Sequence, residues 1–395
     1  MTSENMDNVK VDQEISLEED DSSIKASQII DPTEVQKDHK LGFFEKLLAV
    51  WVVLCMGIGI LLSVYLPKFG ETLNNWNFFE SWRGGIGINI PIGICLFLMM
   101  YPAMLNLQFK EVKKLGKNPL PIILTLFSNW IIAPLVAAGL AYLILPGNPD
   151  LIIAVILLGS SPCTAMVLVW GRLAKGNQEQ NVINTSINTI SIMFLYVPIV
   201  SLLTGIGSLS IDRLMLFITV SIFIGAPLVL GLLSKVLLVR AKGREWFDTK
   251  YRPIVGKISI VALLSTLIIL FSINGNKLIE YPLELLLVSA PLLLGFFIVV
   301  GLNLLITKLF RLQYREAIIT TIIGSSSHFE IAIATALGIS ALAALGTTMG
   351  LFWEVPIMLS LVYLGKWLNK KGFWKGRKKE EILVPQQKKE EIADT

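Results

Sequence analysis

Three side chains that could do chemistry lie inside long apolar stretches of the sequence: Cys163, Glu330 and Glu354. Cys163 follows a Gly-Ser-Ser-Pro motif that begins at Gly159, and Glu330 ends a Gly-Ser-Ser-Ser-His-Phe-Glu motif. A thiolate is a soft nucleophile and metal ligand, and a carboxyl group held away from water favours its neutral form and can carry a proton. The sequence therefore predicts that a soft, thiol-seeking solute and a proton meet near these residues.

The stretches around these residues have the length and composition of transmembrane helices. The chain of 395 residues is 53% hydrophobic, with a mean hydropathy of +0.66, and an apolar run of about 20 residues is long enough to cross a bilayer. We therefore expect an all-α membrane protein, because lipid-facing backbone must bond within its own segment and no β-barrel alternation is visible. The ten expected helices cover residues 42–66, 84–105, 119–145, 150–171, 182–204, 213–239, 254–273, 282–307, 316–338 and 341–365.

Lysines and arginines collect in alternate loops between the expected helices. The longest basic loop holds Arg240, Lys242, Arg244, Lys250 and Arg252. Cytoplasmic loops of membrane proteins carry this excess, so both termini of this multi-pass protein are expected to be cytoplasmic, in the cell membrane. The basic excess is therefore a topology signal and not a nucleic-acid-binding surface, and the expected partner is the lipid bilayer.

The two ends of the chain differ from the apolar region, residues 42–365. Residues 1–41 form an acidic cytoplasmic tail, because the first 40 residues hold eleven Asp or Glu against four Lys. Such a composition favours disorder. Residues 366–395 form a basic cytoplasmic tail.

The two Gly-Ser-Ser motifs mark an internal repeat. They stand 165 residues apart, and the same offset places expected helices one, two, three and five near six, seven, eight and ten. Five helices per repeat is an odd number, so the second repeat must be inverted, as in secondary transporters. Pro162 lacks an N–H and crowds the carbonyl of Leu158, and Ser325 to Ser327 can bond an unwound turn, so each motif should break its helix. We expect the two broken helices to cross at a solute site.

The polar residues of these breaks and of two neighbouring helices are the candidate site. The substrate-binding candidates are Cys163, Ser160, Ser161, Thr164, Ser326 and Ser327, and the proton-coupling candidates are Glu330 and His328. For Cys163 the alternative is a small apolar filler, and for Glu330 and His328 it is a structural hydrogen bond.

Further polar residues lie on the fifth and tenth expected helices. Glu354 precedes Pro356, and it could cap backbone groups that Pro356 frees or take part in function. Asn184 and Asn188 repeat at helical spacing. Either they bond neighbouring helices or they line a cavity.

Motif absences exclude several classes of protein. The sequence contains no P-loop, HExxH, CxxC or Gly-x-Ser-x-Gly motif, so neither an enzyme nor a cofactor is expected. No pore-loop signature of an ion channel is visible either. A membrane-bound sensor or subunit without transport stays open as an alternative.

Three segments of the chain carry a resemblance to a known family. Pro162-Cys163-Thr164-Ala165-Met166-Val167-Leu168-Val169-Trp170, Phe329-Glu330-Ile331-Ala332-Ile333-Ala334 and Glu354-Val355-Pro356 resemble the arsenical-resistance efflux permeases. These permeases belong to the superfamily that also holds the bile acid:sodium symporters and riboflavin transporters. The similarity to these permeases in the arrangement of helices covers residues 42–365.

The resemblance implies a fold and a function. The fold is ten helices, with a panel domain of helices one, two, six and seven and a core domain of helices three to five and eight to ten. The function is export of trivalent arsenic, as arsenite and in some relatives antimonite, driven by proton entry, with Cys163 as the metalloid contact and Glu330 as the essential carboxyl group. The resemblance sets no oligomeric state. A sodium-coupled symporter of an organic anion on the same fold is the alternative.

Overall fold

The sequence folds as helices wherever apolar runs were expected, and proline and glycine mark where these helices bend or end. The computed structural model describes residues 48–78, 88–105, 119–164, 166–209, 211–280 and 282–374. These residues belong to one compact unit. The predicted tail at 1–41 and most of the tail at 366–395 lie outside the described residues.

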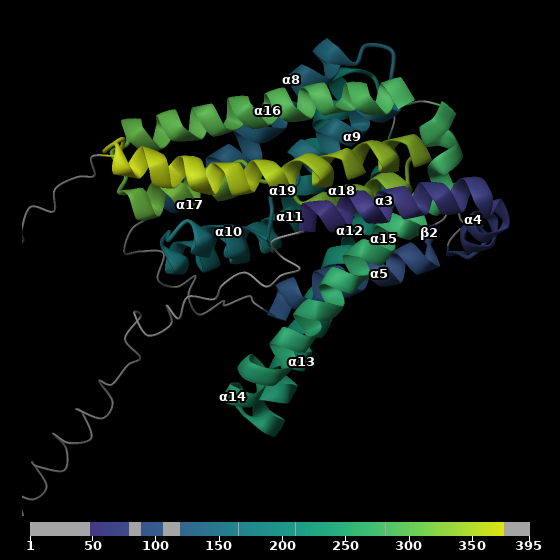
Figure 1. The fold of residues 1–395 in the computed structure, drawn as a ribbon. Coiled ribbons are helices and arrows are strands. Elements are labelled where there is room, and N and C mark those ends of the chain that lie inside the picture. The colour runs from purple at the N-terminus through teal and green to yellow at the C-terminus, as the bar shows by residue number, and fades with distance from the viewer. Residues whose placement is uncertain are drawn as a thin grey trace, which may run out of the picture. The chain divides into compact units, whose positions relative to one another are not determined.

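The first half of the chain contains short helices and one long one (Figure 1). Its elements are α3 (Leu48–Tyr65), α4 (Pro67–Asn74), β1 (Asn77–Phe78), β2 (Ile88–Asn89), α5 (Ile90–Leu105), α7 (Leu120–Phe127), η2 (Ser128–Ile132), α8 (Ala133–Ile144), α9 (Pro149–Gly159), α10 (Val167–Leu173) and α11 (Gln178–Ile206). The strands β1 and β2 form a two-residue antiparallel pair, a small departure from the expected all-α fold.

The second half of the described chain includes three helices of 28 to 30 residues. Its elements are α12 (Arg213–Val220), η3 (Ser221–Gly225), α13 (Ala226–Lys242), α14 (Arg244–Trp246), η4 (Phe247–Tyr251), α15 (Arg252–Glu280), α16 (Pro282–Leu309), α17 (Tyr314–Gly324), α18 (Phe329–Leu337) and α19 (Ala341–Lys370).

Proline explains the three π-helical turns η2, η3 and η4. In each case a proline is the second residue after the wide turn: Pro134, Pro227 and Pro253. A proline ring crowds the carbonyl four residues earlier and supplies no N–H, and inserting one residue into the turn is a recognised way for a helix to accommodate such a site. The helix then continues in each case, so these prolines shape spans without ending them.

The helices have the dimensions of a multi-pass membrane protein. Six stretches of the described residues are long and apolar enough to cross a bilayer by themselves: Leu120–Ile144, Gln178–Ile206, Arg213–Lys242, Arg244–Gly275, Leu286–Leu309 and Ala341–Lys370. The α3–α4 pair, bent by 102°, would be a seventh. The other apolar segments that were expected to span are the short α5 and the two interrupted pairs α9–α10 and α17–α18.

The helices pack in two sets. α15 packs against α3 and α5, and α13 packs against α5. In the second set α16 contacts α8, α17 and α19, while α9 contacts α8, α18 and α19. Figure 1 shows α16 and α19 running side by side in this set. The interrupted helices α9–α10 and α17–α18 both belong to the second set, so its packing positions the site.

Candidate functional site

The breaks in α9–α10 and α17–α18 are joined to each other through their backbones. Pro162 and Ser327 form an isolated antiparallel bridge, and the His328 N–H donates to the Ser161 carbonyl at 2.7 Å. Unwound backbone inside a membrane protein needs hydrogen-bond partners, and each break supplies partners to the other. The prediction that the two breaks meet is therefore confirmed for these residues.

Serine hydroxyls bond carbonyls at the ends of the interrupted helices. Ser161 Oγ lies 2.9 Å from the Leu158 carbonyl and 3.2 Å from the His328 carbonyl. Ser326 Oγ donates to the Ile323 carbonyl at 3.2 Å. The last carbonyls of a helix have no partner within the helix. Small hydroxyl residues at these positions bond such carbonyls and so stabilise the interruptions. Ser160 is fully buried at 0% exposure, beside Ser161.

A row of three side chains crosses from one break to the other. Thr164 Oγ1 and His328 Nε2 share a hydrogen bond of 2.8 Å, and His328 Nδ1 lies 2.8 Å from Glu330 Oε2. The side chains of His328 and Glu330 are 1% and 10% exposed. Both ring nitrogens are therefore in contact with polar groups, and the imidazole connects the α9–α10 break to the carboxyl group of α18.

Glu354 joins the same crossing from α19. Its Oε2 accepts a hydrogen bond from Ser327 Oγ at 2.9 Å, and the residue is 7% exposed. The helix α19 runs unbroken through Pro356. The expectation that Pro356 opens this helix is therefore wrong, because a continuous helix tolerates the proline here and Glu354 bonds the neighbouring break rather than freed groups of its own helix.

Cys163 lies in the first break, 3% exposed. Its carbonyl accepts from Asn188 Nδ2 at 3.4 Å, and Asn188 Oδ1 accepts from Asn129 Nδ2 at 3.2 Å. Asn188 of α11 thus reaches the break. Asn184, one turn earlier on α11, instead donates to Thr125 Oγ1 at 3.1 Å, so it bonds a neighbouring helix.

The π-helical turn η2 contributes residues that the sequence analysis missed. Asn129 reaches Asn188, and Ser128 Oγ donates to the Gly324 carbonyl at 2.9 Å, directly before the second break. Asn303 of α16 donates to Ser325 Oγ at 3.1 Å. The available signal was the Ser-Asn pair within an otherwise apolar span that contains Pro134.

A cavity of about 90 Å³ lies against the crossing. Its polar lining includes Asn129, Ser161, Ser325, Ser326 and Ser327. Its apolar wall comes from α8, α9 and α16. A space of this size holds several water-sized molecules, so a small polyhydroxyl solute fits its dimensions.

The cavity and the polar row share only part of the predicted site. Ser161, Pro162, Ser326 and Ser327 line the cavity. The residues Cys163, Thr164, His328 and Glu330 belong to the crossing but are not part of that lining. Among the described residues no three His, Cys, Asp or Glu side chains gather as metal ligands. The other two cysteines, Cys55 and Cys95, lie on α3 and α5.

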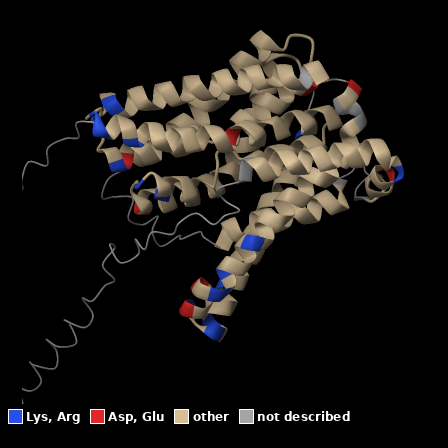
Figure 2. Cartoon of the chain, viewed as in Figure 1, with Lys and Arg blue, Asp and Glu red and all other residues tan. Residues whose placement is uncertain are grey.

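Charges are rare along the helices and collect at their ends. In Figure 2, Lys and Arg appear in blue at the α13–α14 tip and at the ends of α16 and α19 near the start of α17. Long stretches of each helix between these ends carry neither blue nor red. This distribution is that of a protein whose helices cross a membrane.

Comparison with known proteins places the chain among transporters. It matches the Sodium Bile acid symporter family over residues 93–281. It is 36% identical over 377 residues to an uncharacterized transporter of Synechocystis, covering 90% of this chain and 96% of that protein. The arsenical-resistance protein Acr3 of Alkaliphilus metalliredigens is 35% identical over 353 residues, covering 86% and 96% of the two chains. The Acr3 protein of Corynebacterium glutamicum is 27% identical over 349 residues, covering 85% and 92%.

Proposed function

Because the chain belongs to the family of the arsenical-resistance protein Acr3 and matches the Sodium Bile acid symporter family over residues 93–281, we propose that it exports arsenite from the cell in exchange for protons. A member of this family is a membrane transporter and not an enzyme. The observation that carries the proposal is the crossing of the two helix breaks. It joins the cysteine-containing break to the Glu330 carboxyl group through Thr164 and His328.

The proposed architecture is ten membrane spans in two inverted repeats of five. Six of the ten spans would be the long stretches described above. The other four would be the bent pair α3–α4, the short α5 and the interrupted pairs α9–α10 and α17–α18. The panel domain would contain α3, α5, α12–α13 and α15, and the core domain the remaining spans. The packing of α15 against α3 and α5, which is denser than its packing against the core helices, supports this division. Basic residues at one set of helix ends support cytoplasmic termini in the cell membrane (Figure 2).

The chemistry of the first break suits arsenite. Arsenite is a neutral trihydroxide near neutral pH, and its arsenic centre prefers soft thiolate ligands over hard oxygen ligands. Attack by the Cys163 thiol would displace one hydroxyl group as water, with the thiol proton, and the reverse step would release the solute. One sulfur rather than three keeps the binding reversible, which any transport cycle requires. Nearby hydroxyls, from Ser160, Ser161 and Thr164, would bond the remaining arsenic hydroxyls, and those of Ser326 and Ser327 face the adjoining cavity.

Glu330 is the proposed proton carrier, with His328 as its partner. Ionisable side chains inside membrane spans are expensive and mark proton or ion pathways. His328 Nδ1 lies 2.8 Å from Glu330 Oε2, so a charged imidazole would attract the carboxylate directly. The same imidazole touches Thr164 in the break that holds Cys163, so solute binding there could change where the proton resides.

Everted membrane vesicles give the direct test, because their acidified lumen corresponds to the cell exterior. Wild-type vesicles should accumulate arsenite while a trapped pH dye reports proton loss, and antimonite should be tested in parallel. Cys163→Ser should remove most accumulation, whereas Cys55→Ser, at a buried cysteine of α3, should not. Full transport by Cys163→Ser would overturn the role of the thiol.

Glu330→Gln tests the coupling in the same vesicles. It should abolish arsenite-dependent proton loss, and Glu280→Gln, at an exposed helix end, is the matched control. Continued proton exchange by Glu330→Gln would overturn the carrier assignment. Transport that follows an imposed sodium gradient and is indifferent to Cys163→Ser would favour a sodium-coupled symporter of an organic anion instead.

A further inference from the structure

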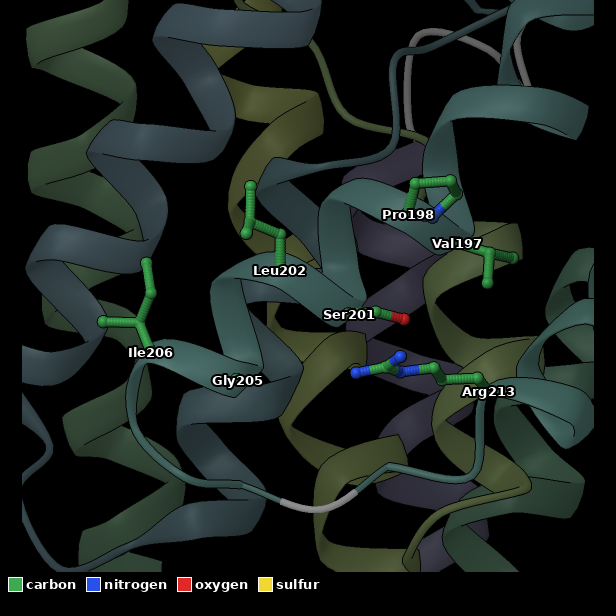
Figure 3. A pocket seen from close by; sticks show the side chains of 7 residues that line it. All are labelled: Val197, Pro198, Ser201, Leu202, Gly205, Ile206 and Arg213. Carbon is green, nitrogen blue, oxygen red and sulfur yellow. The ribbon is translucent and has the colours of Figure 1, made fainter.

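A second polar feature lies away from the crossing, at the end of α11. An open groove of about 630 Å³ runs along one face of this helix and ends at the first residue of α12. Its lining residues are Val197, Pro198, Ser201, Leu202, Gly205, Ile206 and Arg213. Figure 3 shows the Arg213 side chain extending toward the α11 face from the neighbouring helix.

The groove is apolar along its length and exposed. Leu202 and Ile206 are 67% and 69% exposed. The distance from Val197 to Ile206 is about 14 Å at the rise of an α-helix, close to half of a hydrocarbon core of about 30 Å. The groove therefore has the length of the acyl region of one leaflet.

The end of the groove lies where α11 leaves the hydrocarbon. α11 is a candidate span, and it ends at Ile206. Tyr142 of α8 fixes this end, since its hydroxyl donates to the Leu203 carbonyl at 2.7 Å and accepts from the Gly207 N–H at 3.2 Å. Tyrosine is typical of the headgroup level of a membrane. Arg213 therefore stands at the depth of the lipid phosphates.

Two polar groups at the groove lack a protein partner among the described residues. Ser201 Oγ is buried without a hydrogen-bond partner, and Figure 3 shows it pointing toward the guanidinium of Arg213. No carboxylate of the described residues forms a salt bridge with Arg213. The adjacent acid, Asp212, accepts instead from the N–H groups of Leu214 and Met215. A guanidinium without a carboxylate suits a phosphate, which it can bind through two parallel hydrogen bonds.

We propose that this groove is a binding site for one glycerophospholipid, with its phosphate on Arg213 and Ser201 and one acyl chain along α11. The site needs the apolar groove, its cation and its hydroxyl together, because only a lipid presents a phosphate and a chain of this length to the same surface. It is independent of the arsenite site, since none of its residues belongs to the crossing.

Two substitutions test the phosphate contact and the acyl-chain contact separately. Arg213→Gln removes the contact to the phosphate. Gly205→Leu fills the groove, because a Cβ built at Gly205 meets no atom within 4 Å. The matched controls are Arg244→Gln, whose side chain is 80% exposed at the α14 end, and Gly301→Leu on α16, where a Cβ also meets no atom within 4 Å.

Native mass spectrometry of the full chain released from nanodiscs of phosphatidylethanolamine and phosphatidylglycerol counts retained lipids. The wild type and both controls should retain one tight phospholipid. Each test variant should lower the binding affinity for that lipid at least about tenfold. This is the scale expected for loss of a charge-assisted hydrogen bond to the phosphate or of the packing of the acyl chain. Equal retention by all five proteins would overturn the proposal.

Two further arms identify the ligand and the place. Inorganic phosphate and glycerol 3-phosphate should not displace the retained lipid, and displacement by either at concentrations comparable to the lipid's would assign the site to free phosphates instead. A phosphatidylglycerol with a photoreactive group on its acyl chain should crosslink to the peptide that contains residues 197–213. Crosslinking confined to other peptides would overturn the proposed location.

Discussion

The hydrogen bond between Thr164 and His328 links the two interrupted helices through side chains, and it can be removed with little change of shape. Thr164→Val replaces the hydroxyl by a methyl group. The bond is 2.8 Å long, and the two residues are 3% and 1% exposed. Water has little access to the histidine nitrogen that loses its partner. We therefore expect the variant to be destabilised and its arsenite transport to fall, since His328 is no longer held against Glu330 from the opposite side.

The magnitude follows from the burial of the histidine. Leaving a buried polar group without a partner costs about 1–3 kcal/mol, which corresponds to about a 5- to 150-fold change in a folding equilibrium constant. Thr321→Val is the matched control. Thr321 is 0% exposed, and its hydroxyl donates at 2.9 Å to the Ala317 carbonyl of its own helix. Loss of such a bond within a helix should be close to neutral.

A double-mutant cycle with His328→Ala isolates the contact from other effects of each substitution. Free energies of unfolding would be measured in mixed detergent micelles for both single variants and the double variant. A coupling energy of about 0.5–3 kcal/mol is expected for residues in direct contact. A coupling energy near zero, or equal losses for Thr164→Val and Thr321→Val, would refute the argument that this hydrogen bond joins the two breaks.

Two further predictions concern packing around the site. Gly159→Ala should destabilise the protein by about 1–3 kcal/mol, because the new methyl group would collide with Ala137 Cβ at the end of α9; Gly301→Ala, in open space, should be neutral or stabilising in the same unfolding measurement. Trp374→Ala should lower the free energy of unfolding by about 3 kcal/mol, because its indole is 7% exposed and donates to Thr307 Oγ1 at 3.1 Å. The control Trp367→Ala, at a side chain that is 51% exposed, should shift the thermal midpoint little. Equal shifts for the two variants would contradict the packing role of Trp374.

Local chemistry made the helix breaks predictable from the sequence. Pro162 cannot continue a helix, and a row of serines offers the backbone other partners, so both interruptions occur where the motifs lie. The helix bounds follow the apolar runs in the same way, as at α3, which ends at Tyr65. The expected second span began at residue 84, but α5 begins at Ile90. Asn89 caps it there by accepting from the Ile92 N–H at 3.2 Å, a local contact that hydropathy does not detect.

Tertiary contacts at the site were harder to predict. The pairing of Asn129 with Asn188 requires the depth and rotation of two helices, and a π-helical turn changes the rotation of one of them. Glu354 could be recognised as unusual in an apolar span, but its partner Ser327 lies 27 residues away, in the break between α17 and α18. The periodicity of a sequence identifies which face is polar, whereas the partner of that face depends on packing.

The contacts at the crossing also constrain how access to it could alternate. The two breaks are fixed to each other by backbone hydrogen bonds and by the Ser161 hydroxyl. Asn188 attaches them to α11, and Ser128 attaches them to η2. Separating the breaks would remove several of these hydrogen bonds at once, and each group left buried without a partner would cost about 1–3 kcal/mol. Sliding the whole set past α3, α5 and α15 breaks none of these bonds. Alternating access by movement of that set as one body is therefore the less costly route, and it would carry Cys163 and Glu330 together.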